Sequence, residues 1–136
     1  MNRKQLLLLL TAFFLLPLVL LAQENHCTLQ KSPKRMAIEA GQQIYAGQCQ
    51  HCHQADGSGS SVVNLSLIES AKVEGDKGAL IDLLVTGKSS SSSDPHAFDG
   101  AALTDEQIAA VLTYIRNSFG NSASMVKKDE VKKRRS

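Results

Sequence analysis

The stretch "GQCQHCHQADGSG", from Gly47 to Gly59, constrains this chain most, because two cysteines and two histidines lie close together in it. Cys49 and Cys52 are three positions apart, and His53 follows the second cysteine directly. At this C-x-x-C-H spacing, two thiols can add to the two vinyl groups of a haem while the adjacent imidazole reaches its iron. The C-x-x-C part alone also occurs in redox disulfides and in zinc sites.

For each alternative to haem, the sequence lacks a feature that the site requires. A thioredoxin-like disulfide lies beside a βαβ unit, and no strand-like alternation flanks these cysteines. Zinc takes four ligands, whereas the motif supplies three, and the nearest candidates outside it are Cys27 and His96. A structural zinc module is therefore the less favoured alternative. We interpret His51 as a solvent-facing spacer and Cys27 as a free or intermolecular thiol.

The size and composition of the chain agree with a bound cofactor. A chain of 136 residues forms one small domain with a thin core. It has no Trp, and its aromatic residues beyond the leader are Tyr45, Phe98, Tyr114 and Phe119. A covalently held haem would supply the missing apolar bulk, and such attachment suits a chain too short to hold a large flat group otherwise.

The N-terminus has the pattern of an export signal. Arg3 and Lys4 precede an apolar run from Leu6 to Ala22. This pattern predicts a signal peptide over residues 1–22, with an uncleaved membrane anchor as the alternative, and a linker over residues 23–35. Either way we expect the domain in the periplasm or on the outer face of the cytoplasmic membrane, with possible membrane association through this apolar segment.

Charge is divided unevenly along the exported part. Residues 23–126 hold 7 basic and 11 acidic side chains, whereas residues 127–136 hold 6 basic and 2 acidic ones. We therefore interpret residues 121–136 as a basic C-terminal tail that stays solvated and disordered, or docks on anionic lipid or an acidic partner. Basic and aromatic residues are not interleaved in the domain, so we expect no nucleic-acid binding.

Caps and hydrophobic periodicity predict three helices. The first covers about Lys34 to Gln48 and runs into the cysteine motif. The second begins near Asp76 and ends at Gly87, and the third begins with the capping box "TDEQ" at Thr104 and ends at Gly120. The fold class predicted is therefore all-α.

Two segments carry a family resemblance. "GQQIYAGQCQHCHQADGSG" is similar to the first helix and haem site of class I, single-haem cytochromes c, and "LTDEQIAAVLTYIRNSFGN" is similar to their C-terminal helix. The likeness covers about residues 36–131, and we place the domain itself at 36–120. The resemblance implies a helical domain wrapped around a covalently bound haem. It also implies that the first and last helices cross, with Gly41 and Tyr45 facing Tyr114.

The same resemblance implies roles for the motif and a function for the chain. Cys49 and Cys52 would form the thioethers of haem c, and His53 would be the proximal ligand of its iron. The chain would be an electron carrier rather than an enzyme, and a dehydrogenase or a respiratory oxidase would be its partner. A haem sensor or weak peroxidase is the main alternative.

The sequence departs from the family on both faces of the haem. The family has a proline whose carbonyl holds the proximal histidine, but residues 62–70 contain none. The family's second iron ligand is a Met before the last helix, and that place is taken by Ser93, inside a run of serines. His96 is the one strong ligand in this loop. The alternatives to His96 are a vacant or water-bound iron, Met125, or a partner's side chain.

Overall fold

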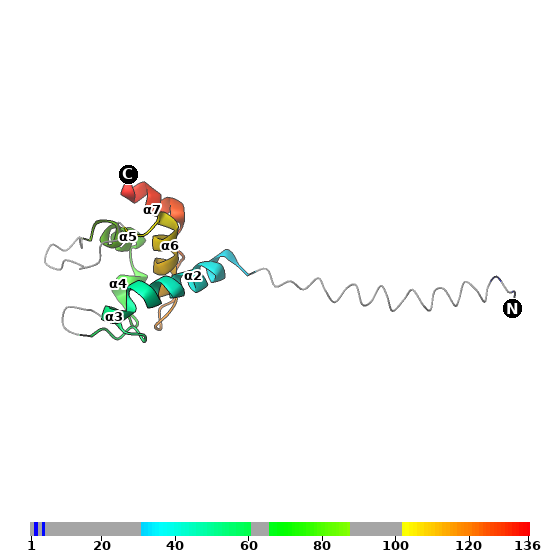
Figure 1. The fold of residues 1–136 in the computed structure, drawn as a ribbon, viewed down its shortest axis with the longest axis horizontal. Coiled ribbons are helices and arrows are strands. Elements are labelled where there is room, and N and C mark those ends of the chain that lie inside the picture. Colours follow the sequence, from blue (N-terminus) through cyan, green and yellow to red (C-terminus); the bar gives the residue numbers. More distant parts are fainter. Residues whose placement is uncertain (1, 3, 5–30, 61–65, 88–101) are drawn as a thin grey trace. The chain divides into compact units, whose positions relative to one another are not determined.

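The computed structural model describes residues 2, 4, 31–60, 66–87 and 102–136 of the chain. Residues 32–136 form one compact unit, which Figure 1 shows as a group of short helices. Regular structure within the described residues is helical, which confirms the predicted all-α class. The elements are α2 (Pro33–Gln48), α3 (Gln50–His53), α4 (Ala71–Glu74), α5 (Lys77–Thr86), α6 (Asp105–Ile115) and α7 (Lys128–Arg135).

Helix α2 agrees closely with the first predicted helix. Ser32 caps its N-terminus by accepting a hydrogen bond from the Arg35 amide, and Pro33 occupies the first turn, where its missing N–H has no cost. The buried positions of α2 are Gly41 and Tyr45, one turn apart on the face that meets α6.

The crossing of α2 and α6 depends on the absence of a side chain at Gly41. A Cβ atom there would lie 2.7 Å from Cβ of Tyr114 and closer still to the carbonyl oxygen of Ala110. The ring of Tyr45, one turn on, lies 5.3 Å from the ring of Tyr114 and 5.2 Å from that of Phe119. The prediction that Gly41 and Tyr114 face each other is thereby confirmed.

The predicted caps of α5 and α6 are present. Asp76 accepts hydrogen bonds from the amides of the first turn of α5, and Gly87 ends this helix in the left-handed conformation, with φ of 66°. Thr104 and Gln107 form the reciprocal capping box of α6. Four apolar residues at helical spacing along α6 are buried, namely Ile108, Val111, Leu112 and Ile115.

The predicted end of α6 at Gly120 is wrong, because the helix ends at Ile115 with Arg116 as its C-cap. The following residues form turns in which Phe119 has a φ of 58°, in the left-handed region. This conformation accompanies the packing of the Phe119 ring against Tyr45. Gly120 also has a positive φ, but it lies within the turn and does not end the helix.

Residues 121–136, called the C-terminal segment below, are ordered, so the prediction of a solvated tail is wrong. Val126 and Val131 are buried in the core, with 1% and 0% of their surfaces exposed. Around them α7 forms ion pairs with acidic residues of the domain: Lys128 with Glu106, Arg134 with Asp82, and Arg135 with Asp105. The acidic partner of the basic tail is therefore its own domain.

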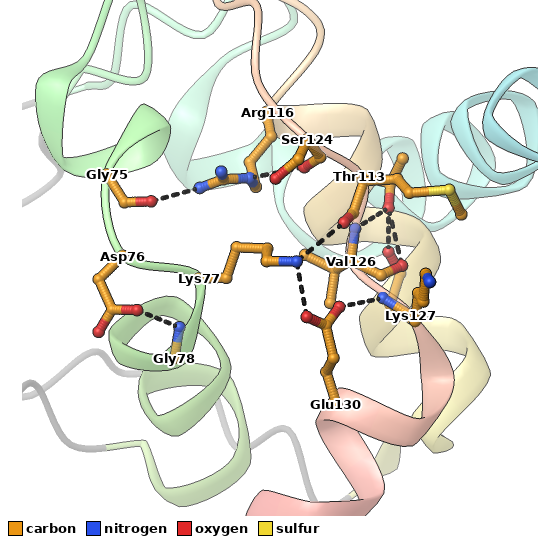
Figure 2. A network of polar contacts seen from close by, with 12 residues as sticks. Gly75, Asp76, Lys77, Gly78, Thr113, Arg116, Ser124, Val126, Lys127 and Glu130 are labelled. Carbon is orange, nitrogen blue, oxygen red and sulfur yellow. Dashed lines mark hydrogen bonds and ion pairs between the residues drawn. The ribbon is translucent and has the colours of Figure 1, made fainter.

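A buried cation joins the C-terminal segment to α4. The Arg116 guanidinium donates to the carbonyl oxygens of Val73, Glu74 and Gly75 at the end of α4, and to that of Ser124 at 3.0 Å. Burial lowers the pKa of Arg116 from its ordinary value. Figure 2 shows Arg116 between Gly75 and Ser124, and Lys77 reaching Glu130 of α7.

Candidate functional site

The cysteine motif forms one helical turn that continues α2. Cys49 is the C-cap of α2, and its amide donates to the Tyr45 carbonyl at 2.9 Å. The amides of Cys52 and His53 both donate back to the Cys49 carbonyl, at 3.1 and 2.9 Å. All three motif side chains are half-buried, and both thiols are free. The structure thus places the three predicted site residues on a single turn.

The chain bends sharply after His53, and hydrogen bonds hold the bend. Gln54 has a φ of 64°, and its carbonyl accepts a hydrogen bond of 2.7 Å from the Tyr45 hydroxyl. The Gly59 amide donates to the His53 carbonyl at 3.0 Å. The backbone of His53 is therefore fixed on both sides, by α3 before it and by the bend after it, and its Nδ1 atom is buried.

The thiol of Cys49 does not have the acidity of a redox nucleophile. Burial, followed by the proximity of Cys52, raises the pKa of Cys49 to about 11. Reactive C-x-x-C thiols have the opposite shift, because a lowered pKa populates the thiolate. Burial likewise raises the pKa of Tyr45, one turn before Cys49. This environment argues against the disulfide-exchange interpretation and suits a thiol held in an apolar setting.

Several predictions fall outside the described residues. These are Cys27, Ser93, His96 and the leader apart from residues 2 and 4. Within the described part of the chain, no three His, Cys, Asp or Glu side chains gather as a metal site would require. None of the helices in that part has the length and apolar character needed to cross a membrane.

The structure describes both methionines beyond the leader, and hydrogen bonds constrain the backbone of each. Met36 is 58% exposed in the first turn of α2, about 20 Å along the helix from Cys49 at a rise of about 1.5 Å per residue. The Met125 carbonyl accepts a hydrogen bond from Lys77, and its neighbour Val126 is hydrogen-bonded to Thr113. Ligation by Met36 would require α2 to unwind or move.

Comparison with known proteins agrees with this geometry. The family model described as Cytochrome c matches residues 38–119, which is more than half of the chain. The chain belongs to the cytochrome c family. Its cofactor is therefore haem c with iron, covalently bound, and its function is haem-based electron transfer, which in this family is typically the work of an electron carrier. The search of curated proteins finds no match.

The residues present fit the cofactor. Two free, half-buried thiols and one imidazole come from a single turn at the end of α2, which is the donor set that covalent haem attachment requires. Cys49 also packs against the hydrophobic core. A haem attached there would extend this core.

Sequence reasoning missed the buried polar residues Arg116 and Asn121 and the helices α3, α4 and α7. Arg116 and Asn121 are 3% and 6% exposed, and both hydrogen-bond to residues more than 40 positions away. No local pattern marks such contacts. Helix α7 did carry a signal, because Asp129 and Glu130 lie in its first turn and four basic residues in its last, which complements the helix dipole.

Proposed function

We propose that this chain is a single-haem electron carrier of the periplasm or the outer face of the cytoplasmic membrane, in which Cys49 and Cys52 form the thioethers and His53 binds the iron. The observation that carries the proposal is the placing of two free thiols and His53 on one turn that continues α2. In such a carrier the iron of haem c supplies the one-electron couple, and the protein supplies its position and axial ligand.

The described residues have distinct tasks in this proposal. Cys49 and Cys52 anchor the cofactor at the end of a helix that is locked to α6 at Gly41. The hydrogen bonds on both sides of His53 fix the backbone position from which its imidazole would reach the iron. Tyr45 supports the bend below it by donating to the Gln54 carbonyl.

The experiment for this function is a redox titration of the mature protein, followed by its visible spectrum. A carrier should show one reversible one-electron couple and haem c bands that are lost in the double variant of both cysteines. Cys27→Ser provides the matched control, because Cys27 lies outside the motif, and it should titrate as the unaltered protein does. A protein that shows no haem bands after expression with cytochrome maturation would contradict the proposal.

For the sixth ligand we propose His96, with an open or water-bound iron as the second candidate. The sequence supports this choice because no Met lies between Gly87 and Leu103, and Met36 lies at the far end of α2. An open iron would favour the sensor or peroxidase alternative. Carbon monoxide binding to the reduced protein without denaturant distinguishes them: slow, weak binding supports His96, and it should become fast in His96→Ala. Fast binding in the unaltered protein supports the open site.

The partner and the location rest on the sequence alone. The pattern of residues 1–22 supports export, and we propose a dehydrogenase or a respiratory oxidase outside the cytoplasm as the redox partner. Fractionation of cells that produce the unaltered chain tests the location. Recovery of the haem protein from the cytoplasm would contradict it.

A further inference from the structure

Asn121 links the end of α6 to the segment that precedes α4. Its side chain is buried, and Nδ2 donates to the carbonyl oxygens of Ile115 at 3.1 Å and Leu67 at 2.8 Å. Its Oδ1 atom accepts a hydrogen bond of 2.9 Å from the Ser70 amide. Both N–H groups and the oxygen of the amide are therefore used, and two of their three partners lie in residues 67–70.

Leu67 is bonded in turn to the residues that follow His53. Its amide donates to the Gly57 carbonyl at 2.8 Å, and the Ser66 hydroxyl donates to the same oxygen at 3.4 Å. Gly57 lies in the bend after His53, and the Gly59 amide closes that bend on the His53 carbonyl. A path of hydrogen bonds thus runs from Asn121 through Leu67 to the bend.

Phe119 makes a second connection between the same two regions. Its carbonyl accepts a hydrogen bond of 3.0 Å from the Glu69 amide. Its ring lies against Gly57, where a Cβ atom would be 2.7 Å from Cγ of Phe119 and where φ is +76°. Gly57 is therefore held from two sides, by the ring of Phe119 and by the hydrogen bond from Leu67, and little room is left for it to move.

We propose that Asn121 is a positioning residue for His53, acting through Leu67 and Gly57. The inference rests on the proposed role of His53 as iron ligand. Residues behind a metal ligand orient it and affect the metal's properties, and a path through backbone groups does so by fixing where the ligand's own backbone lies. Without the amide, the carbonyls of Leu67 and Ile115 lose their donor inside the protein, so residues 66–70 would shift and the bend would shift with them.

The test uses Asn121→Asp, which keeps the shape and the acceptor but removes the two N–H donors, and the milder Asn121→Ser in case the first does not fold. Photolysis of the reduced carbon monoxide complex leaves the haem iron with His53 alone, whichever group is the sixth ligand. The iron–histidine stretching band in the resonance Raman spectrum then reports the geometry of His53. We expect this band to shift or broaden and the reduction potential to change in both variants. The changes relative to the unaltered protein should be larger in Asn121→Asp than in Asn121→Ser.

Thr113→Val is the matched control. Thr113 is as deeply buried, and its hydroxyl hydrogen-bonds to Ala109 and to Val126 of the C-terminal segment, which are not on the path described above. We expect it to lower the unfolding midpoint and leave the band in place. If the Asn121 variants lower the midpoint in the same way and the band does not move, Asn121 has a structural role only. An unaltered protein without a Soret band would instead overturn the proposed function, and this inference with it.

Discussion

Helix α2 meets α6 through backbone and rings, whereas α7 meets α5 and α6 through charges around two valines. At the first contact Gly41 lets the backbones touch, and Tyr45 packs beside it. At the second, Val126 and Val131 are buried while paired charges surround them. Close packing depends on shape and tolerates no added atom, but exposed ion pairs are adaptable and individually weak. The first contact supports the proposed haem site, and the second involves α7, which lies outside the family match.

The largest effect on the free energy of unfolding is expected at the α2–α6 contact. Gly41→Leu should prevent the observed crossing, and even Gly41→Ala should cost about 3 kcal/mol, because its Cβ would meet the backbone of Ala110. Gly47→Ala is the control on the same helix. A Cβ there meets nothing within 4 Å, so Ala should stabilise by about 0.5–1 kcal/mol. Denaturant unfolding of the holo-protein measures both, and equal effects would show that the helices do not cross at Gly41.

An intermediate effect is expected from the buried valine of α7. Val131→Ala removes two methyl groups from a side chain that is 0% exposed and should cost about 2 kcal/mol. Lys132→Ala, on the next residue and exposed, should leave stability within about 0.5 kcal/mol of the unaltered value. Thermal unfolding of the two variants provides the measurement. If they melt together, α7 is not docked in solution and the solvated-tail prediction stands after all.

The smallest effect concerns the charge of Glu130. The hydrogen bond from Lys77, at 2.6 Å, lowers the pKa of this carboxyl below its ordinary value of 4.5, and the Lys127 amide adds to the shift. A lowered folded pKa means that the stabilisation is present above pH 4.5 and is lost as the pH falls through the folded value.

Glu130→Gln should therefore lose less stability than the unaltered protein between pH 7 and pH 3. The difference should be below about 1 kcal/mol, because the pair is partly exposed to solvent. Asp129→Asn is the control at the neighbouring exposed position, and urea titrations at the two pH values give the comparison. An identical loss of stability between pH 7 and pH 3 in Glu130→Gln and the unaltered chain would show that Glu130 does not stabilise the contact of α7 with the domain.

The contrast between the two contacts also explains what the sequence could predict. Helices α2, α5 and α6 have local signals, such as Pro33 after a serine, Gly87 at a C-terminus and the Thr104 capping box. Helix α7 has one buried apolar residue, Val131, so hydrophobic periodicity could not reveal it. It docks through Val131 and through ion pairs with acidic side chains more than twenty positions away along the chain, which local patterns do not report.

The candidate site divides in the same way. Cys49, Cys52 and His53 could be predicted because their spacing is itself the chemical requirement. Asn121 could not, since an asparagine after a glycine is typical of a turn, and its importance depends on Leu67 and Ser70, which are distant in sequence. The residues that carry the chemistry could be predicted from the sequence, whereas the residues that hold them in place could be identified only from the structure.

We propose that haem c is attached through Cys49 and Cys52, and the intact mass of the mature protein, made in cells competent in cytochrome maturation, is the measurement that decides this. The mass should exceed that of the polypeptide by one haem in the unaltered protein and in Cys27→Ser, and the Cys49→Ala, Cys52→Ala double variant should have the mass of the polypeptide alone. Recovery of the apo mass from the unaltered protein, or of a haem adduct from the double variant, would contradict the claim.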